Sequence, residues 1–262
     1  MLLQELCQTL NEIAPVRLAE SWDNVGLLVG DGSASVERVM TCLTITDTSL
    51  DEAIAERADL VISHHPIPFK PLSRITSNHT TGRLLLKAIR ANVAIYSPHT
   101  AWDNASHGIN RQLATMLAVQ SPTPLAPAAD PELAKQGLGT GIYGKLSRRF
   151  TLEELVQKLE LSLPTIRPRA THPLQQSISN IGIVCGSGGS MVGLAAQRGC
   201  DAFLTGEATY HQCLEAESLG VAMVMIGHFA SEFFAMRQLA DMLSRRAPGL
   251  HFWASMKDDS QF

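Results

Sequence analysis

Residues 36–65, VERVMTCLTITDTSLDEAIAERADLVISHH, decide the fold. Residues 36–46 are β-branched and mostly apolar, which predicts a buried strand. Residues 47–58 have apolar side chains at helical spacing and an Asp or Thr that can cap the first turn, which predicts a helix. The mostly apolar residues 59–63 predict a second strand. A strand, a helix and a strand in this order predict a βαβ unit with parallel strands.

The same alternation extends in both directions from this stretch. An amphipathic helix is expected before Pro15, and one continuous helix is expected from residue 228 to 247. The remaining expectations are helices at 80–92, 98–117, 151–161, 191–199 and 207–220, strands at 93–97, 139–146, 178–186, 201–206, 221–227 and 251–255, and an extended stretch at 164–170. This alternation predicts an α/β fold with largely parallel sheets.

The chain is expected to form two units. Residues 120–136 are rich in Pro, Ala and Gly and break every periodicity, so we interpret them as a connector between a first α/β unit, 1–125, and a second, 126–262. The last helix could pack back on the first unit. Aligning the two halves places Asp59 over Asp201 and His65 over Glu207. This internal similarity suggests two related, pseudo-repeated α/β units, each offering ligands from the carboxyl ends of its strands.

Histidines point to the chemistry, because five of the nine lie between residues 64 and 107. His64 and His65 follow a predicted strand at the edge where open α/β sheets bind ligands. Neighbouring side chains diverge there, so the pair could reach two ions a few ångströms apart. His228 and Glu232 stand four apart on a predicted helix and share one face. Each pattern also has an ordinary explanation. His64 and His65 could be solvated side chains in a loop, and Glu232 could be a first-turn glutamate that complements the helix dipole.

Carboxylates complete this candidate site. A two-metal site needs groups that can bridge the cations, and Asp103 and Glu232 supply them. With His64, His65 and His228 they make five protein ligands and leave open positions for water, a catalytic pattern. His99 is a candidate catalytic residue that could shuttle a proton or orient a ligand. Glu207 and His211, also four apart, are candidate substrate-binding residues.

Composition excludes several other classes. The formal net charge is −4 and 18% of residues are charged, which disfavours nucleic acid as a partner. The five cysteines form no C-x-x-C pair, so a zinc ribbon is not expected. The glycine-rich turn 186–190 lacks the lysine of a phosphate-binding P-loop. With no signal peptide and no long apolar run, we expect a cytoplasmic protein without a membrane segment.

Several motifs together resemble the Nif-three-like dinuclear metal-centre proteins, many of which are called GTP cyclohydrolase I type 2 homologues. They are WDNVGLLVGD at 22–31, DLVISHHP at 59–66, YSPHTAWDNASHGIN at 96–110, CGSGGS at 185–190, DAFLTGEATYH at 201–211 and IGHFASE at 226–232. The family motif usually reads SPHTNLD, so Ala101 and Trp102 depart from it, while Asp103 is kept. The resemblance implies the same five metal ligands.

The resemblance also implies two interlinked α/β units with a metal site between them, assembled as a toroidal homohexamer. It further implies the short form of the family, without an inserted middle domain. It implies two divalent ions per subunit, iron, zinc or manganese. The function it favours is a metal-dependent hydrolase acting on a small molecule, with ring opening of a nucleotide such as GTP as one form. A dinuclear phosphoesterase is the alternative within the enzyme class. A non-enzymatic metal-binding or storage protein is the alternative outside it.

Overall fold

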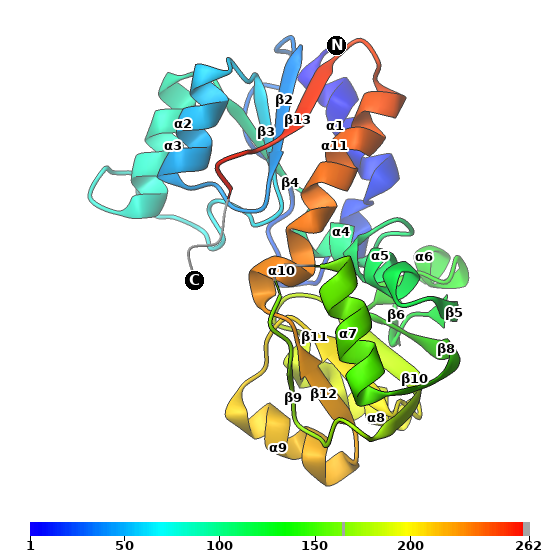
Figure 1. The fold of residues 1–262 in the computed structure, drawn as a ribbon. Helices are drawn as coiled ribbons and strands as arrows, with labels where there is room; N and C mark the ends of the chain where they lie inside the picture. The colour runs from blue at the N-terminus through cyan, green and yellow to red at the C-terminus, as the bar shows by residue number, and fades with distance from the viewer. Residues whose placement is uncertain (164–165, 259–262) are drawn as a thin grey trace. The chain divides into compact units, whose positions relative to one another are not determined.

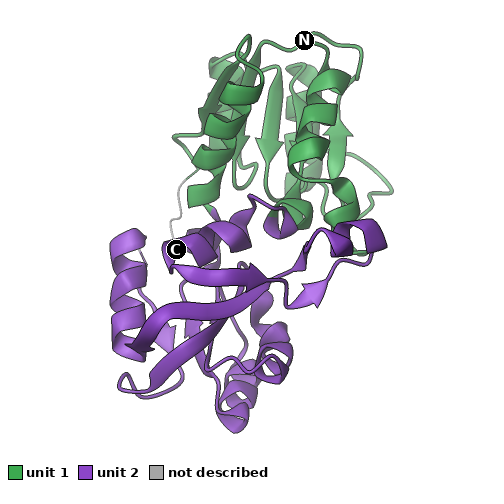
Figure 2. Ribbon diagram, turned by 90° about the vertical axis from the view of Figure 1, so that its right-hand side faces the viewer, with its two compact units in different colours: residues 1–102, 233–262 green, residues 103–232 purple. Residues whose placement is uncertain are grey.

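The computed structural model describes residues 1–163 and 166–258, and the chain forms two compact units. Unit 1 comprises residues 1–102 and 233–262, and unit 2 comprises residues 103–232 (Figure 2). The chain therefore passes from unit 1 to unit 2 at Trp102–Asp103 and returns at Glu232–Phe233. Each unit has its own sheet and its own apolar core.

Unit 1 contains a five-stranded sheet in the order β1-β4-β3-β2-β13, in which only β1 runs antiparallel to its neighbour. Figure 1 shows α2 and α3 on one side of this sheet and α1 and α11 on the other. Its elements are α1 (Leu3–Ile13), the 3-10 helix η1 (Val16–Leu18), β1 (Gly26–Val29), β2 (Arg38–Cys42), α2 (Asp47–Ala55), β3 (Leu60–Ser63), α3 (Thr80–Arg90), β4 (Ala94–Ser97), α11 (Phe234–Arg246) and β13 (His251–Ala254). The helix α4 (His99–Asn104) spans the first passage between the units.

Unit 2 contains a six-stranded sheet in the order β5-β8-β10-β11-β12-β9. Strands β10, β11 and β12 are parallel, whereas β5, β8 and β9 pair antiparallel at the two sides. Its elements are α5 (Ile109–Met116), β5 (Val119–Thr123), β6 (Ala126–Pro127), α6 (Pro131–Lys135), β7 (Gly139–Thr140), β8 (Ile142–Thr151), α7 (Leu152–Ser162), β9 (Arg169–Ala170), β10 (Ser177–Val184), the 3-10 helix η2 (Gly188–Met191), α8 (Val192–Gln197), β11 (Ala202–Thr205), α9 (Tyr210–Leu219), β12 (Ala222–Met225) and α10 (His228–Glu232).

The predicted α/β fold is confirmed, and its parallel strands are the ones that the helical and apolar periodicities indicated. The predicted helix cap at Thr151 is also present. Its hydroxyl accepts a hydrogen bond from the Glu154 backbone N–H, and the Glu154 carboxylate accepts one from the Thr151 N–H. Of the predicted extended stretch 164–170, residues 169–170 form β9, and residues 164–165 lie outside the described part of the chain.

The division into units differs from the predicted boundaries at residue 125. The sequence indicates a connector at residues 120–136, but these residues contribute to β5, β6 and α6. Strand β5 pairs with β8, and the Asp130 carboxylate caps helix α6, whose first residue is Pro131. Residues 103–125 therefore belong to unit 2. Residues 233–262 belong to unit 1, since β13 adds to β2 and α11 packs on both strands.

Two predicted single helices are each divided. The segment 98–117 forms α4 and α5, with Gly108 preceding the second helix. The segment 228–247 forms α10 and α11, which meet at Phe233. Both breaks fall beside a candidate ligand, because α4 contains Asp103 and α10 ends at Glu232. Among the described residues, no helix combines the length and the apolar character that a membrane crossing requires.

The internal similarity expected from the sequence recurs in the hydrogen bonds. One Asp59 carboxylate oxygen accepts from the backbone N–H groups of Glu37 and Arg38, at 2.8 and 2.9 Å. One Asp201 carboxylate oxygen accepts in the same way from residues 179 and 180, at 2.7 and 2.8 Å. Asp59 directly precedes β3 and Asp201 directly precedes β11, so each carboxylate links the start of one strand to the backbone of the neighbouring parallel strand. The two units share this local construction as well as an order of elements.

Candidate metal-binding residues

His64 and His65 continue directly from β3, whose four residues are all buried. The backbone N–H groups of both histidines donate to the carbonyls of Cys42 and Leu43, each at 2.9 Å, so the β2–β3 pairing extends past the strand end. The Ser97 hydroxyl donates to the His64 carbonyl at 2.6 Å. The His64 side chain is fully buried. The predicted position at the carboxyl end of a parallel strand is therefore the observed one.

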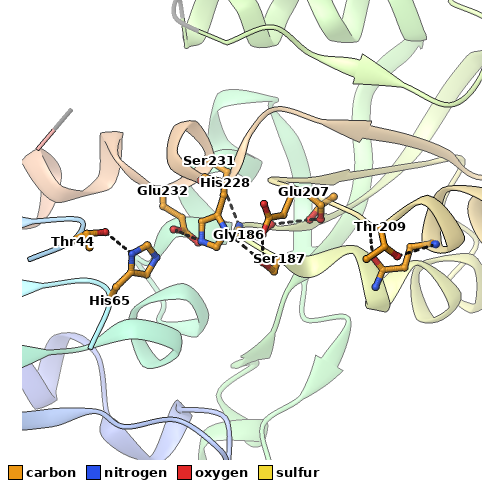
Figure 3. Close-up of polar contacts among 11 residues, drawn as sticks. Thr44, His65, Gly186, Ser187, Glu207, Thr209, His228, Ser231 and Glu232 are labelled. Carbon is orange, nitrogen blue, oxygen red and sulfur yellow. Dashed lines mark hydrogen bonds and ion pairs between the residues drawn. The ribbon is translucent and has the colours of Figure 1, made fainter. Parts of the chain in front are cut away.

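Thr44 orients the imidazole of His65. Its hydroxyl oxygen lies 2.7 Å from His65 Nδ1 (Figure 3). When Nδ1 carries the proton and donates to this hydroxyl, the lone pair of Nε2 is available to a cation. Thr44 was not among the residues selected from the sequence, because a threonine after a strand carries no pattern of its own.

Asp23 holds His99 in a similar way. His99 Nδ1 lies 2.7 Å from one Asp23 carboxylate oxygen, and the Asp23 side chain is completely buried. Burial would raise the pKa of Asp23, but hydrogen bonds from His99 and Thr100 lower it overall. The carboxylate is therefore ionised, and its contact with Nδ1 fixes the orientation of the His99 ring. Sequence reasoning missed this role of Asp23, although the aspartate lies in the quoted WDN motif.

The imidazoles of unit 1 form a compact group. His64, His65 and His99 each offer a ring nitrogen, and these three atoms lie within 4.8 Å of one another. Imidazole nitrogens suit zinc, iron and other transition metals. We call these residues the histidine trio. Its donor set fits a metal ion, and it brings His99, predicted only as a catalytic residue, next to two predicted ligands.

In unit 2, His228 lies between two carboxylates. Its Nε2 is 3.2 Å from a Glu232 oxygen and its Nδ1 is 3.0 Å from a Glu207 oxygen (Figure 3). The hydrogen bond to Glu232 raises the pKa of His228 against the effect of burial, and Glu207 raises it further, to about 9. A cationic imidazolium is thus stable at this place. The same anionic surroundings suit a metal cation.

The glycine-rich turn after β10 brings Ser187 to this group. The Ser187 hydroxyl donates to the Glu207 carboxylate and lies 3.3 Å from His228 Nδ1. These contacts lower the pKa of Glu207. Gly186 has a φ of +58°, and a Cβ there would collide with a Glu232 carboxylate oxygen. Glycine is therefore required at this position for the turn to pass so close to the Glu232 carboxylate.

Asp103 is held by two other residues of unit 2. One of its carboxylate oxygens lies 3.2 Å from the Cys185 sulfur, whose thiol donates to it. Burial, Asp103 and Glu232 together raise the pKa of Cys185, so the thiol keeps its proton. Asn110 bridges the same two residues, because its amide donates to the Asp103 carbonyl and accepts from the Cys185 N–H. Neither Cys185 nor Asn110 was selected from the sequence.

Glu207 and His211 were predicted as one polar pair. Helix α9 begins only at Tyr210, after the cap Thr209, so Glu207 lies in the preceding loop and the helical spacing does not apply to the pair. Glu207 contacts Ser187 and His228, while the His211 ring contacts the Tyr210 ring. Their assignment to substrate binding stays a prediction.

The model of the Duf34/NIF3 (NGG1p interacting factor 3) family matches residues 1–259. The chain belongs to the NIF3 family. The resemblance inferred from the sequence motifs is thereby confirmed.

Proteins similar to this NIF3 member include two bacterial examples. A GTP cyclohydrolase 1 type 2 homolog of Clostridium acetobutylicum is 33% identical over 88% of this chain and 85% of its own length. A GTP cyclohydrolase 1 type 2 of Helicobacter pylori is 32% identical over 88% of this chain and 87% of its own length.

Solved structures of NIF3 proteins share the fold. A Bacillus cereus protein related to NIF3 matches with a TM-score of 0.90 at 22% identity, covering 100% of this chain and 98% of that one. The Staphylococcus aureus protein SA1388 matches with a TM-score of 0.89 at 26% identity, with the same coverage.

Proposed function

We propose that this protein is a metal-dependent hydrolase with a nucleotide such as GTP as its substrate. The observation that carries the proposal is the histidine trio, in which two proposed ligands, His64 and His65, gather within 4.8 Å of the proposed proton donor His99. The relatives from Clostridium acetobutylicum and Helicobacter pylori are named GTP cyclohydrolase 1 type 2 homolog and GTP cyclohydrolase 1 type 2, which supports the reaction class.

The proposed ligands of two divalent ions are the five residues selected from the sequence, His64, His65, Asp103, His228 and Glu232. Bound divalent ions supply an acidified water and polarise the attacked centre. Iron, zinc and manganese all suit mixed imidazole and carboxylate ligands. In this proposal the protein works in the cytoplasm as a toroidal homohexamer.

Other residues of the chain orient two of these ligands, His65 and Asp103, and also His99. Thr44 and Asp23 each contact Nδ1 of a histidine, at 2.7 Å, which leaves the opposite nitrogen of each ring for a metal or a proton. Cys185 donates to Asp103 and so restricts which oxygen of that carboxylate faces a ligand. In the proposed reaction His99 Nε2 passes a proton to the leaving group, and Asp23 orients the ring for this transfer through its contact with Nδ1.

The experiment loads the purified protein separately with iron, manganese and zinc and supplies GTP and a panel of phosphoesters. Release of formate from GTP would demonstrate ring opening. We expect His64→Ala and Glu232→Ala to lower turnover by more than about hundredfold, a loss typical of removing a catalytic metal ligand. Glu153→Ala, on the exposed face of α7, is the control and should match the wild type.

One outcome would narrow the proposal and another would contradict it. Phosphate release without formate would make the protein a nucleotide phosphoesterase and would exclude ring opening. Metal-replete protein that converts none of the compounds would instead favour a metal-binding or storage role.

A further inference from the structure

Two large aromatic side chains of unit 1 are exposed together. Trp22 is 60% exposed and Phe69 is 47% exposed, and their ring centroids lie 5.9 Å apart at an interplanar angle of 51°. Trp102, by contrast, is fully buried. A tryptophan and a phenylalanine side by side present a large apolar area to solvent, and such patches mark binding surfaces more often than single exposed residues do.

Hydrogen bonds hold the loops that carry these rings. The Asn24 amide donates to the Pro68 carbonyl at 2.7 Å, which ties the loop of Trp22 to the loop of Phe69. The buried Asp23 carboxylate accepts from the backbone N–H groups of Asn24 and Thr100. The two rings are therefore positioned before any ligand arrives, which lowers the entropic cost of binding.

The aromatic pair adjoins the histidine trio. The His99 ring centroid lies 6.1 Å from that of Trp22 and 6.2 Å from that of Phe69, in both cases edge to face. The same His99 ring lies 5.1 Å from His64 and 5.7 Å from His65. A molecule lying on the exposed rings would thus extend toward the predicted metal ligands of this unit.

We propose that Trp22 and Phe69 form a stacking platform for the planar ring of a nucleobase. The inference rests on the proposed function, because it assigns the part of the substrate that unit 1 recognises. Aromatic side chains bind nucleobases through their π-faces, and neither ring carries a charge with which to attract a phosphate. The platform therefore recognises the base of the substrate and leaves its phosphates to other groups.

The test measures binding by calorimetry, with the whole chain in its metal-loaded form. Guanosine is the probe for the base, and ribose 5-phosphate is the probe for the remainder of a nucleotide. We expect Trp22→Ala to weaken guanosine binding about tenfold, the usual effect of removing one stacking partner, and Phe69→Ala to weaken it by a similar factor. Trp22→Phe should restore most of the affinity. Ribose 5-phosphate binding and metal content should not change.

Leu161→Ala is the matched control, because Leu161 is an 86% exposed apolar side chain on α7 of unit 2. It should leave guanosine binding unchanged. The proposal is overturned if the wild type does not bind guanosine, or if Trp22→Ala binds it as tightly as the wild type. It is also overturned if Trp22→Ala lowers the oligomeric state in sedimentation, since a second copy of the chain would then cover the rings.

The platform and the hydrolase proposal fail in different ways. Weaker guanosine binding by Trp22→Ala, in a protein that hydrolyses no nucleotide, would support the platform and refute the hydrolase. Hydrolysis of GTP with the same KM in the wild type and in Trp22→Ala would refute the platform alone.

Discussion

The loops after β3 and β11 have the same backbone hydrogen bond but present side chains of different chemistry. In unit 1 the strand is followed by His64 and His65, and in unit 2 by Gly206 and Glu207. The backbone N–H of His65 donates to Leu43 and that of Glu207 to Gly186, both at 2.9 Å. His65 is partly buried, whereas the side chain of its counterpart Glu207 is 55% exposed. The pseudo-repeat therefore fixes where a side chain is presented, and the residue at that place decides what it does.

Removing the side chain after each strand should have the largest effect and should separate the two loops. We expect His65→Ala to lower metal affinity by more than about hundredfold, because a direct ligand is lost. Glu207→Ala should lower it only about tenfold, because Glu207 hydrogen-bonds to the proposed ligand His228. Chelator competition and metal analysis measure both affinities.

Glu217→Ala, on the exposed surface of α9, is the control for this comparison and should bind metal as the wild type does. Equal losses in His65→Ala and Glu207→Ala would show that the two loops play the same part. Full metal content in His65→Ala would remove that histidine from the ligand set.

A second comparison concerns the first residue after each strand, which is His64 in unit 1 and Gly206 in unit 2. A Cβ on Gly206 would lie 2.6 Å from the Gly186 carbonyl oxygen and 2.7 Å from the Ser231 hydroxyl. We expect Gly206→Ala to reduce the free energy of unfolding by about 2 kcal/mol, since a backbone atom must shift. Urea unfolding measures the change. Gly249→Ala, where a Cβ meets nothing within 4 Å, should stay within about 0.5 kcal/mol of the wild type.

The third comparison is between Asp59 and Asp201, where the two units are alike. Each carboxylate accepts two backbone hydrogen bonds from a neighbouring strand. We expect Asp59→Ala and Asp201→Ala each to cost about 1.5 kcal/mol, the lower end for a hydrogen-bonded charge. Asp241→Ala, on the exposed side of α11, is the control. If chemical denaturation shows one variant as stable as the wild type, the two aspartates are not equivalent.

Much of the fold could be predicted from local patterns. Strands β3 and β11 are mostly apolar and buried, and Thr151 and Glu154 have the spacing that a capping box requires. The extent of each unit could not be predicted, because it depends on long-range pairing. Strand β13 adds to β2, more than 200 residues earlier in the chain, and no local composition reveals that contact.

The candidate site was predictable to a similar degree. The position of His64 and His65 followed from strand geometry, and the contact between His228 and Glu232 followed from helical spacing. The residues that orient these groups were missed, as Thr44 and Asp23 show. Their roles arise where loops meet, and a single threonine or aspartate in a turn has many commoner explanations.

Unit 2 is an insertion between two parts of unit 1, and this has a consequence for synthesis on the ribosome. All of residues 103–232 emerge before α11 and β13, which supply a helix and an edge strand to unit 1. Unit 2 can therefore complete its sheet during translation. The sheet of unit 1 lacks β13 until later, so β2 is an unpaired edge strand during that time. Unit 1 thus begins to emerge before unit 2 but is completed after it.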